Sequence, residues 1–141
     1  MIRKYNSNDL DSVLEIWLEA SVKAHEFVSA DFWESQVESM RKIYIPASEV
    51  FVYEIESKIV GFYALYENNL AAIFVFPAFQ GQGIGKQLLS HAKAQRVILS
   101  LSVYKENQAS YQFYLSQGFT VVSEQRDEHT GHPEYTMSSG T

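Results

Sequence analysis

Apolar and polar residues in the first third of the chain follow the spacing of one short strand and two helices. Residues 2–5 predict the strand. Polar residues 7–9 offer capping groups for a helix whose apolar positions recur one turn apart as far as about Val22. A second helix is expected after residues 29–31. It should end at Ile45, because the residue before a proline avoids the helical region.

The middle of the chain is rich in β-branched and aromatic residues and predicts three consecutive strands. Residues 50–55 and 59–66 flank a polar turn at 56–58, which is typical of a hairpin. A third apolar run covers residues 70–76 and is closed by Pro77. Its nearly uninterrupted apolarity predicts a strand in mid-sheet that is covered on both faces.

The second half of the chain alternates between helical and strand-like patterns. A glycine-rich turn at 80–85 precedes apolar positions with helical spacing, and Gly118 suits the left-handed residue that ends a later helix. The order of elements predicts one α/β domain over residues 1–141, built as a mixed sheet with helices packed on it. The other expected segments are a buried strand at 97–103, a helix at 107–116, strands at 119–124 and 135–137, and an exposed connection at 125–134.

Composition and charge narrow the function. The chain is 46% hydrophobic and 20% charged, which is typical of a globular protein. A net charge of -6 argues against a nucleic-acid partner and is compatible with a cationic substrate. Without cysteine there is no disulfide, thiolate metal ligand or cysteine nucleophile. The amino terminus lacks a signal peptide and no apolar run is long enough for a membrane span, so we expect a cytoplasmic protein with no membrane partner.

The glycine-rich turn carries most of the functional signal. It follows a predicted strand and opens a helix, so free backbone N–H groups and the positive end of the helix dipole meet there, as a phosphate or pyrophosphate site requires. A P-loop is excluded because Lys86 is followed by Gln87. The dinucleotide fingerprint also fails, since neither Lys86 nor Leu88 is the glycine that it needs. The remaining alternative is a turn whose glycines serve packing alone.

The segment Gln80-Gly81-Gln82-Gly83-Ile84-Gly85 resembles the pyrophosphate-binding motif of the GNAT superfamily of N-acetyltransferases. Downstream, Asn107, Ala109, Phe113-Tyr114 and Gly118-Phe119 are similar to that family's second series in order and spacing. The resemblance covers roughly residues 70–120. It implies a small, bacterial-type, single-domain member with a twisted, mostly antiparallel sheet flanked by helices.

The same resemblance implies acetyl-CoA as co-substrate and assigns residues to it. Tyr114 takes the catalytic position whose phenol protonates the departing thiolate, and a phenol is a plausible donor to a thiolate. Backbone groups near Phe74 and Val75 are expected to pair with the pantetheine arm and to stabilise the oxyanion. The other expected cofactor-binding residues are Gln80, Gly81, Gln82, Gly83, Ile84, Gly85, Lys86 and Asn107.

The acceptor side is less defined. His25 and Phe27, which follow the first helix, and Tyr63 on the hairpin are expected to contact the amine. A general base has to remove a proton from the amine, and four residues stay candidates for it: His25, Glu26, Glu54 and Glu67. The histidines lack the i, i+4 partners or acidic clusters of a metal site, so no metal is expected.

We therefore expect an enzyme in which a primary amine attacks acetyl-CoA directly within a ternary complex. The acceptor is left open between protein lysines, protein N-terminal amines and small-molecule amines. The alternative from another class is a non-catalytic module that binds coenzyme A or acyl-CoA, and Tyr114 argues against it. A monomer and a homodimer are both compatible with the sequence.

Overall fold

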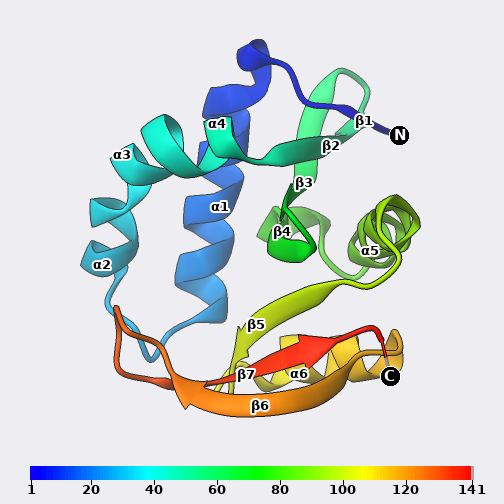
Figure 1. Ribbon diagram of the computed structural model, residues 1–141. Helices are drawn as coiled ribbons and strands as arrows, with labels where there is room; N and C mark the ends of the chain where they lie inside the picture. The colour runs from blue at the N-terminus through cyan, green and yellow to red at the C-terminus, as the bar shows by residue number, and fades with distance from the viewer. Residues whose placement is uncertain (141) are drawn as a thin grey trace.

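The structure is a computed structural model and describes residues 1–140 (Figure 1). Helices and strands follow the predicted order, with short 3₁₀ and π turns between them. The elements are β1 (Ile2–Lys4), η1 (Ser7–Asp9), α1 (Leu10–Ala24), α2 (Ala30–Ser35), α3 (Val37–Ser39), η2 (Met40–Tyr44), α4 (Ile45–Ala47), β2 (Glu49–Ile55), β3 (Lys58–Tyr66), β4 (Asn69–Val75), η3 (Pro77–Phe79), α5 (Ile84–Gln95), β5 (Ser100–Tyr104), α6 (Gln108–Ser116), β6 (Thr120–Arg126) and β7 (Pro133–Ser138).

The strands form one seven-stranded sheet in the order β1-β2-β3-β4-β5-β7-β6. All neighbours are antiparallel except β4 and β5, which are parallel and pair only at Asn69 and Ser100. Beyond that pair the two strands diverge toward their carboxyl ends. The mixed, mostly antiparallel sheet with flanking helices is as the sequence predicted.

Helices cover both faces of the sheet, with α1 and α5 packed on opposite sides of β3 and β4 (Figure 1). On the α1 side the core includes Val13, Trp17 and Phe62. On the α5 side it includes Leu88, Leu89 and Tyr63. Strand β3 lies between these two cores, and its residues from Ile59 to Leu65 are buried. The sheet is therefore the rigid middle layer against which both helices are placed.

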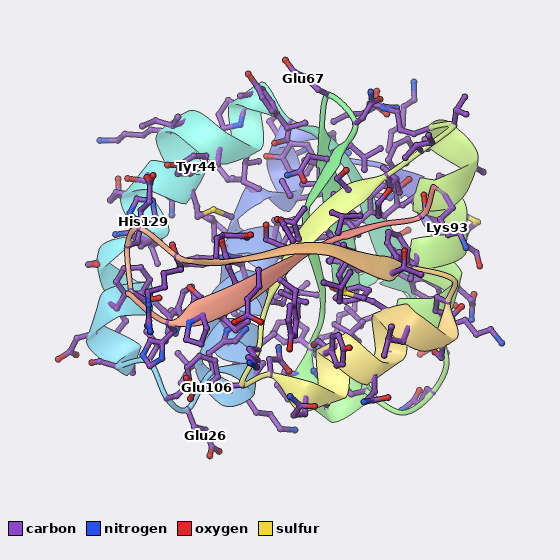
Figure 2. The ribbon with its side chains drawn as sticks, turned by 60° about the horizontal axis from the view of Figure 1, so that its bottom comes forward. Glu26, Tyr44, Glu67, Lys93, Glu106 and His129 are labelled. Carbon is purple, nitrogen blue, oxygen red and sulfur yellow. The ribbon has the colours of Figure 1, made fainter. Side chains whose placement is uncertain are left out.

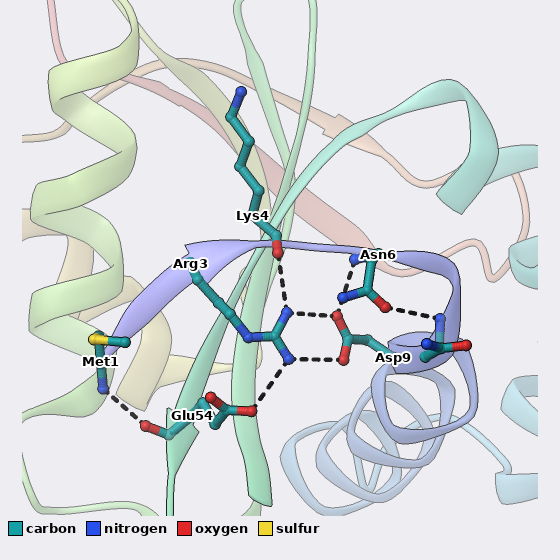
Figure 3. A network of polar contacts seen from close by, with 7 residues as sticks. Met1, Arg3, Lys4, Asn6, Asp9 and Glu54 are labelled. Carbon is teal, nitrogen blue, oxygen red and sulfur yellow. Dashed lines mark hydrogen bonds and ion pairs between the residues drawn. The ribbon is translucent and has the colours of Figure 1, made fainter. Parts of the chain in front are cut away.

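A polar network fixes the amino terminus against the sheet (Figure 3). The Arg3 guanidinium donates to both carboxylate oxygens of Asp9 at 2.9 Å and to Glu54 at 3.2 Å. Asp9 also accepts from the backbone N–H of Asn6, while the Asn6 side chain accepts from the backbone N–H of Asn8, which completes a capping box at the start of η1, the turn that leads into α1. The network thus orients α1, whose far end borders the cleft described below.

The second helix does not end before Pro46, as predicted, but passes through it. The segment is broken into α2, α3, η2 and α4, and Ile45 donates its N–H to the carbonyl of Met40, five residues earlier. Proline is tolerated because it stands in the first turn of α4, where no N–H is needed, after a π turn that has displaced the carbonyls. Ile45 itself is buried.

Three strand predictions also need correction. Strand β5 begins at Ser100 rather than residue 97, and Val97 is fully exposed (100%) because residues 96–99 form the connection from α5 to the edge of β4. Strand β4 lies in mid-sheet as expected but is not covered throughout: Ala71 is exposed and Phe74 is half-buried. The divergence of β5 leaves that part of β4 open. The last strand is longer than predicted and spans Pro133–Ser138.

Candidate active site

A cleft of about 950 Å³ lies where β4 and β5 separate, and residues from both faces of the sheet line it. Val75, Val103 and Tyr114 come from the α5 side of the sheet. Trp17, Trp33 and Tyr104 come from the α1 side. The cleft therefore passes between the two strands and gives two ligands separate approaches to a common centre.

The glycine-rich turn borders one end of the cleft and has the conformation of an anion site. Gly81 and Gly83 have φ of 81° and 82°, a left-handed conformation that favours glycine. The Gln80 amide donates to the Val75 carbonyl at 3.0 Å and ties the turn to the end of β4. At the start of α5, the first turn presents backbone N–H groups that lack helical partners.

These features fit a pyrophosphate. A Cβ built on Gly81 or Gly83 would meet no atom within 4 Å, so the glycines serve backbone direction and an open surface rather than packing. Among the residues predicted for the cofactor, Gln82 is exposed and its side chain does not line the cleft. The residues of the turn and helix start that do line it are Gln80, Gly81, Gly83, Ile84, Gly85 and Lys86.

Strand β4 offers backbone groups along the cleft. Phe74 and Val75 pair with β3 at Phe62 and Gly61, so their other edge faces the gap left by β5. A bulge between Ala64 and Leu65 shifts the register near the start of that gap. An extended ligand with amide groups can pair with such an edge as an additional strand does.

Tyr114, on α6, lies within the cleft and is 9% exposed. It packs against Phe113 and Phe119, with ring centroids 5.6 and 5.9 Å away. Burial raises the pKa of the Tyr114 phenol above its ordinary value, so the group keeps its proton at neutral pH. It can therefore donate that proton or a hydrogen bond to an anion formed in the cleft.

Aromatic rings form the opposite wall of the cleft, on the α1 side. His25 is 8% exposed and stands 5.0 Å from Trp33 and 5.1 Å from Tyr104, measured between ring centroids. Phe27 lies 5.4 Å from Tyr104 and 5.1 Å from His132. Burial lowers the pKa of His25 to about 4, with the Ser21 carbonyl acting in the opposite direction, so the ring is uncharged at neutral pH.

Asn107 stands between the two walls. Its side-chain oxygen accepts from the Ser110 N–H at 3.3 Å and caps α6, the helix that carries Tyr114. Its Nδ2 lies 3.3 Å from Nε2 of His25, and both residues are buried. The structure thus brings together His25, Phe27, Asn107 and Tyr114, which the sequence placed on separate segments.

Charge is distributed unevenly along the cleft. Lys86 stands at the glycine turn, where the helix dipole is also positive. Three carboxylates, Glu26, Glu106 and Glu134, line the part nearer His25, together with Lys23. Figure 2 shows Glu26 and Glu106 at the same edge of the molecule. One end therefore favours an anion and the other a cation.

Tyr63, which was predicted to contact the substrate, does not line the cleft. Its ring is fully buried on the α5 side, stacked 5.2 Å from Phe51, and its hydroxyl lies 2.6 Å from Nδ1 of His91. Two of the proposed bases are also elsewhere. Glu54 is paired with Arg3, and Glu67 lies on the exposed turn between β3 and β4.

The sequence analysis missed several residues of the aromatic and acidic wall. Tyr104 directly follows the strand predicted at 97–103, is the last residue of β5, and precedes Asn107 by three positions, a signal that could have found it. Nothing in the local pattern distinguishes the others from ordinary surface or core residues, because the fold gathers them from α1, α2, β7 and the β5–α6 connection. These residues are Lys23, Trp33, Glu106 and Glu134.

Among residues 1–140, no group of three or more histidines or carboxylates is arranged to hold a metal ion. Within the same described range, no helix combines the length and apolar character needed to cross a bilayer.

A splayed β4–β5 pair, a glycine turn with the conformation of an anion site and a buried phenol are the features expected of an acyl-CoA-dependent transferase. Comparison with known proteins gives the family: the family model described as "Acetyltransferase (GNAT) domain" matches residues 46–121. The chain belongs to the GNAT family of acetyltransferases. It is an N-acetyltransferase that moves an acetyl group from acetyl-CoA to an amine, as predicted.

Relatives cover nearly the whole chain. Peptidyl-lysine N-acetyltransferase YiaC of Escherichia coli strain K12 is 34% identical over 98% of this chain and 95% of its own length. The solution structure of apo-form YjaB from Escherichia coli is 25% identical, with a TM-score of 0.86 over 99% of this chain and 96% of that chain. PaiA N-acetyltransferase of Thermoplasma acidophilum, solved in complex with coenzyme A, shares the fold, with a TM-score of 0.83 at 20% identity over 100% and 98% of the two chains.

Proposed function

We propose that this enzyme acetylates lysine side chains of proteins. The observation that carries the proposal is the acceptor end of the cleft, where aromatic rings pack around an uncharged His25 and three carboxylates contribute to the lining. Carboxylates attract an ammonium group, while the rings contact the alkyl stem of a lysine. Two relatives that cover most of this chain, YiaC and YjaB, carry the name peptidyl-lysine N-acetyltransferase.

The length of a lysine side chain suits this geometry. Tyr114 and His25 are both nine-tenths buried, so the reacting nitrogen has to travel below the surface. A lysine carries its amine on a flexible four-carbon stem and can deliver it while the main chain stays outside. An N-terminal amine has no such stem, and its backbone would have to enter the cleft.

We assign the steps as follows. The amides at the start of α5 and Lys86 hold the pyrophosphate, and the free edge of β4 at Phe74 and Val75 orients the thioester. The neutral amine attacks the carbonyl carbon directly, so the carbon–sulfur bond breaks and the thiolate leaves. Before the attack, the ammonium loses one proton to solvent through the open, carboxylate-lined mouth. After it, Tyr114 donates a proton to the sulfur and is reprotonated by the proton that the acetylated nitrogen loses, so one proton is released per turnover.

A panel of acceptors tests the proposal. The protein is incubated with acetyl-CoA and three matched substrates: a peptide with one internal lysine and a blocked N-terminus, the same peptide with arginine instead and a free N-terminus, and a polyamine. Free thiol release gives the rate, and mass spectrometry locates the acetyl group. We expect the lysine peptide to be modified at least about tenfold faster than the others, a difference of about 1.4 kcal/mol in the barrier. Preference for the free N-terminus or the polyamine would overturn the proposal.

Tyr114→Phe is the control for chemistry. It removes the phenol oxygen and leaves the ring, so turnover should fall by about 100-fold, within the range of general acid catalysis. The affinity for coenzyme A should stay within about twofold, which separates an enzyme with this acid from a module that only binds the cofactor. The cytoplasmic location, the single-domain extent over 1–141 and the choice between monomer and homodimer stay predictions.

A further inference from the structure

The contact between Asn107 and His25 joins the two halves of the active site. The residues are 82 positions apart in the sequence, and each is only 8% exposed. Asn107 belongs to the start of α6, on the cofactor side, whereas His25 follows α1 on the acceptor side. A single side-chain amide therefore contacts both the helix that carries Tyr114 and the wall that the amine approaches.

The cap on α6 determines which way that amide faces. The Asn107 oxygen receives the Ser110 N–H at 3.3 Å. In the reversed orientation Nδ2 would face the Ser110 N–H, and two donors would oppose each other. The amide nitrogen must therefore point to His25, whose Nε2 lies 3.3 Å away.

The direction of the amide in turn determines the state of the imidazole. An amide nitrogen can only donate, so Nε2 of His25 must be the acceptor and carry no hydrogen. A neutral ring then has its hydrogen on Nδ1, which is buried and has no hydrogen-bond partner among residues 1–140, so the contact with Asn107 is what selects this tautomer. Protonation of Nε2 would break the contact with Asn107 and place an N–H against an N–H.

We propose that Asn107 is a positioning residue that holds His25 as the uncharged tautomer with its hydrogen on Nδ1. This inference rests on the proposed function, because its purpose is to admit a cationic acceptor. An imidazolium in this wall would repel the lysine ammonium, whereas a neutral ring presents an acceptor nitrogen and a flat surface.

The surroundings of His25 explain why such a device is needed. Three carboxylates line the same cleft, Glu26, Glu106 and Glu134, and a proton on the imidazole would be drawn toward them, whereas burial lowers the pKa of His25. The positive charge of Lys23, which also lines the cleft, opposes protonation of His25, and the Tyr104 phenol is neutral. His132 packs against Phe27 and is paired with Glu106 at 2.8 Å. The Asn107 N–H and burial counteract the carboxylates and keep the ring uncharged.

Asn107→Asp separates this role from the helix cap. An aspartate oxygen still accepts the Ser110 N–H, and aspartate is as good an N-cap as asparagine. Its second oxygen, however, faces Nε2 as an acceptor and therefore draws a proton onto that nitrogen. Asn107→Ser is the matched variant, since serine also caps a helix but is too short to impose either state on His25.

The test reads the tautomer directly. Long-range ¹H–¹⁵N NMR of the histidine rings, without any substrate, should show Nε2 of His25 unprotonated and Nδ1 protonated from pH 5.5 to 8.5. His25→Gln assigns the signals. In Asn107→Asp, Nε2 should become protonated over the same range. Thermal unfolding should stay within about 4 °C of the parent protein, since the cap is kept.

Kinetics complete the test. For Asn107→Asp we expect the KM for the lysine peptide to rise about tenfold at pH 7, with Asn107→Ser in between, and a pH profile that shifts only in the aspartate variant. A parent protein with a protonated Nε2, or an aspartate variant with an unchanged His25 spectrum, would overturn the inference. If the spectra are as expected but no lysine peptide is acetylated, the tautomer assignment stands and the proposed acceptor is wrong.

Discussion

Gly83 offers a sharp test of the anion site because its role can be separated from packing. Its φ is 82°, and a Cβ at this position would meet nothing within 4 Å. Gly83→Ala therefore introduces no clash, and its cost is that of a left-handed alanine, about 1 kcal/mol. For a domain of this size that loss lowers the melting temperature by about 3 to 4 °C.

The effect on the cofactor should be larger than the effect on stability. Relief of the strain rotates the peptide unit that precedes α5 and turns its N–H groups away from a bound phosphate. Loss of one hydrogen bond to a charged group weakens binding by about 1.5 to 3 kcal/mol, at least tenfold. At coenzyme A equal to 100 times the parent Kd, ligand stabilisation should fall from about 2.7 to about 1.4 kcal/mol.

Gly131→Ala is the matched control. Gly131 also has a positive φ, 76°, and also has no atom within 4 Å of a built Cβ, but it lies in the loop between β6 and β7 and does not line the cleft. Both variants should lose about the same stability without ligand. Only Gly83→Ala should lose about half of the coenzyme A-induced rise in melting temperature. A full ligand-induced rise in that variant would show that the turn does not hold the pyrophosphate.

Three further substitutions test other parts of the structure. Tyr63→Phe should cost about 1 kcal/mol in urea unfolding by leaving His91 without its partner, while kcat and KM stay unchanged because Tyr63 is outside the cleft. The hydrogen bond from Arg3 holds the pKa of Asp9 below its usual range. The stability that this pair contributes is therefore fully present above the unfolded pKa of about 4, and it is lost as the pH falls through the lower pKa of the folded state. Asp9→Asn should therefore cost about 2 kcal/mol at pH 7 and much less at pH 2. The pKa of His25 is about 4 against 6.5 for a free histidine, so the unfolded chain takes up this proton first and stability declines from pH 6.5 to 4. His25→Gln should flatten that part of the stability profile, and an unchanged slope would contradict the burial of a neutral ring.

The order of helices and strands was predictable because each has a clear hydrophobic period and a clear ending. The errors in the predicted element boundaries occur where tertiary packing, rather than local sequence, determines the backbone conformation. A π turn before Pro46 lets the helix continue through a residue that ends helices in isolation. Val97 has the composition of a strand, but β5 can pair only from Ser100 onward.

The cofactor end of the site was predictable because one continuous segment, residues 80–86, forms most of it. The acceptor end was not, since its residues come from elements that meet only in the folded chain. Strand β3 is buried on both faces, so no polar alternation reveals that Tyr63 points toward α5 rather than into the cleft. The proximity of His25 and Asn107 depends on the packing of His25, which follows α1, against Tyr104 at the end of β5, and local sequence does not encode this contact.

The single pairing between β4 and β5, at Asn69 and Ser100, has a mechanical consequence. It divides the sheet into a four-stranded and a three-stranded panel that share one narrow joint. A ligand bound between the two panels supplies hydrogen bonds that β4 and β5 do not make with each other, and it should therefore make the whole sheet more rigid. Hydrogen exchange of the backbone amides on the facing edges of β4 and β5 should therefore slow when acetyl-CoA binds. It should become faster again when free coenzyme A dissociates.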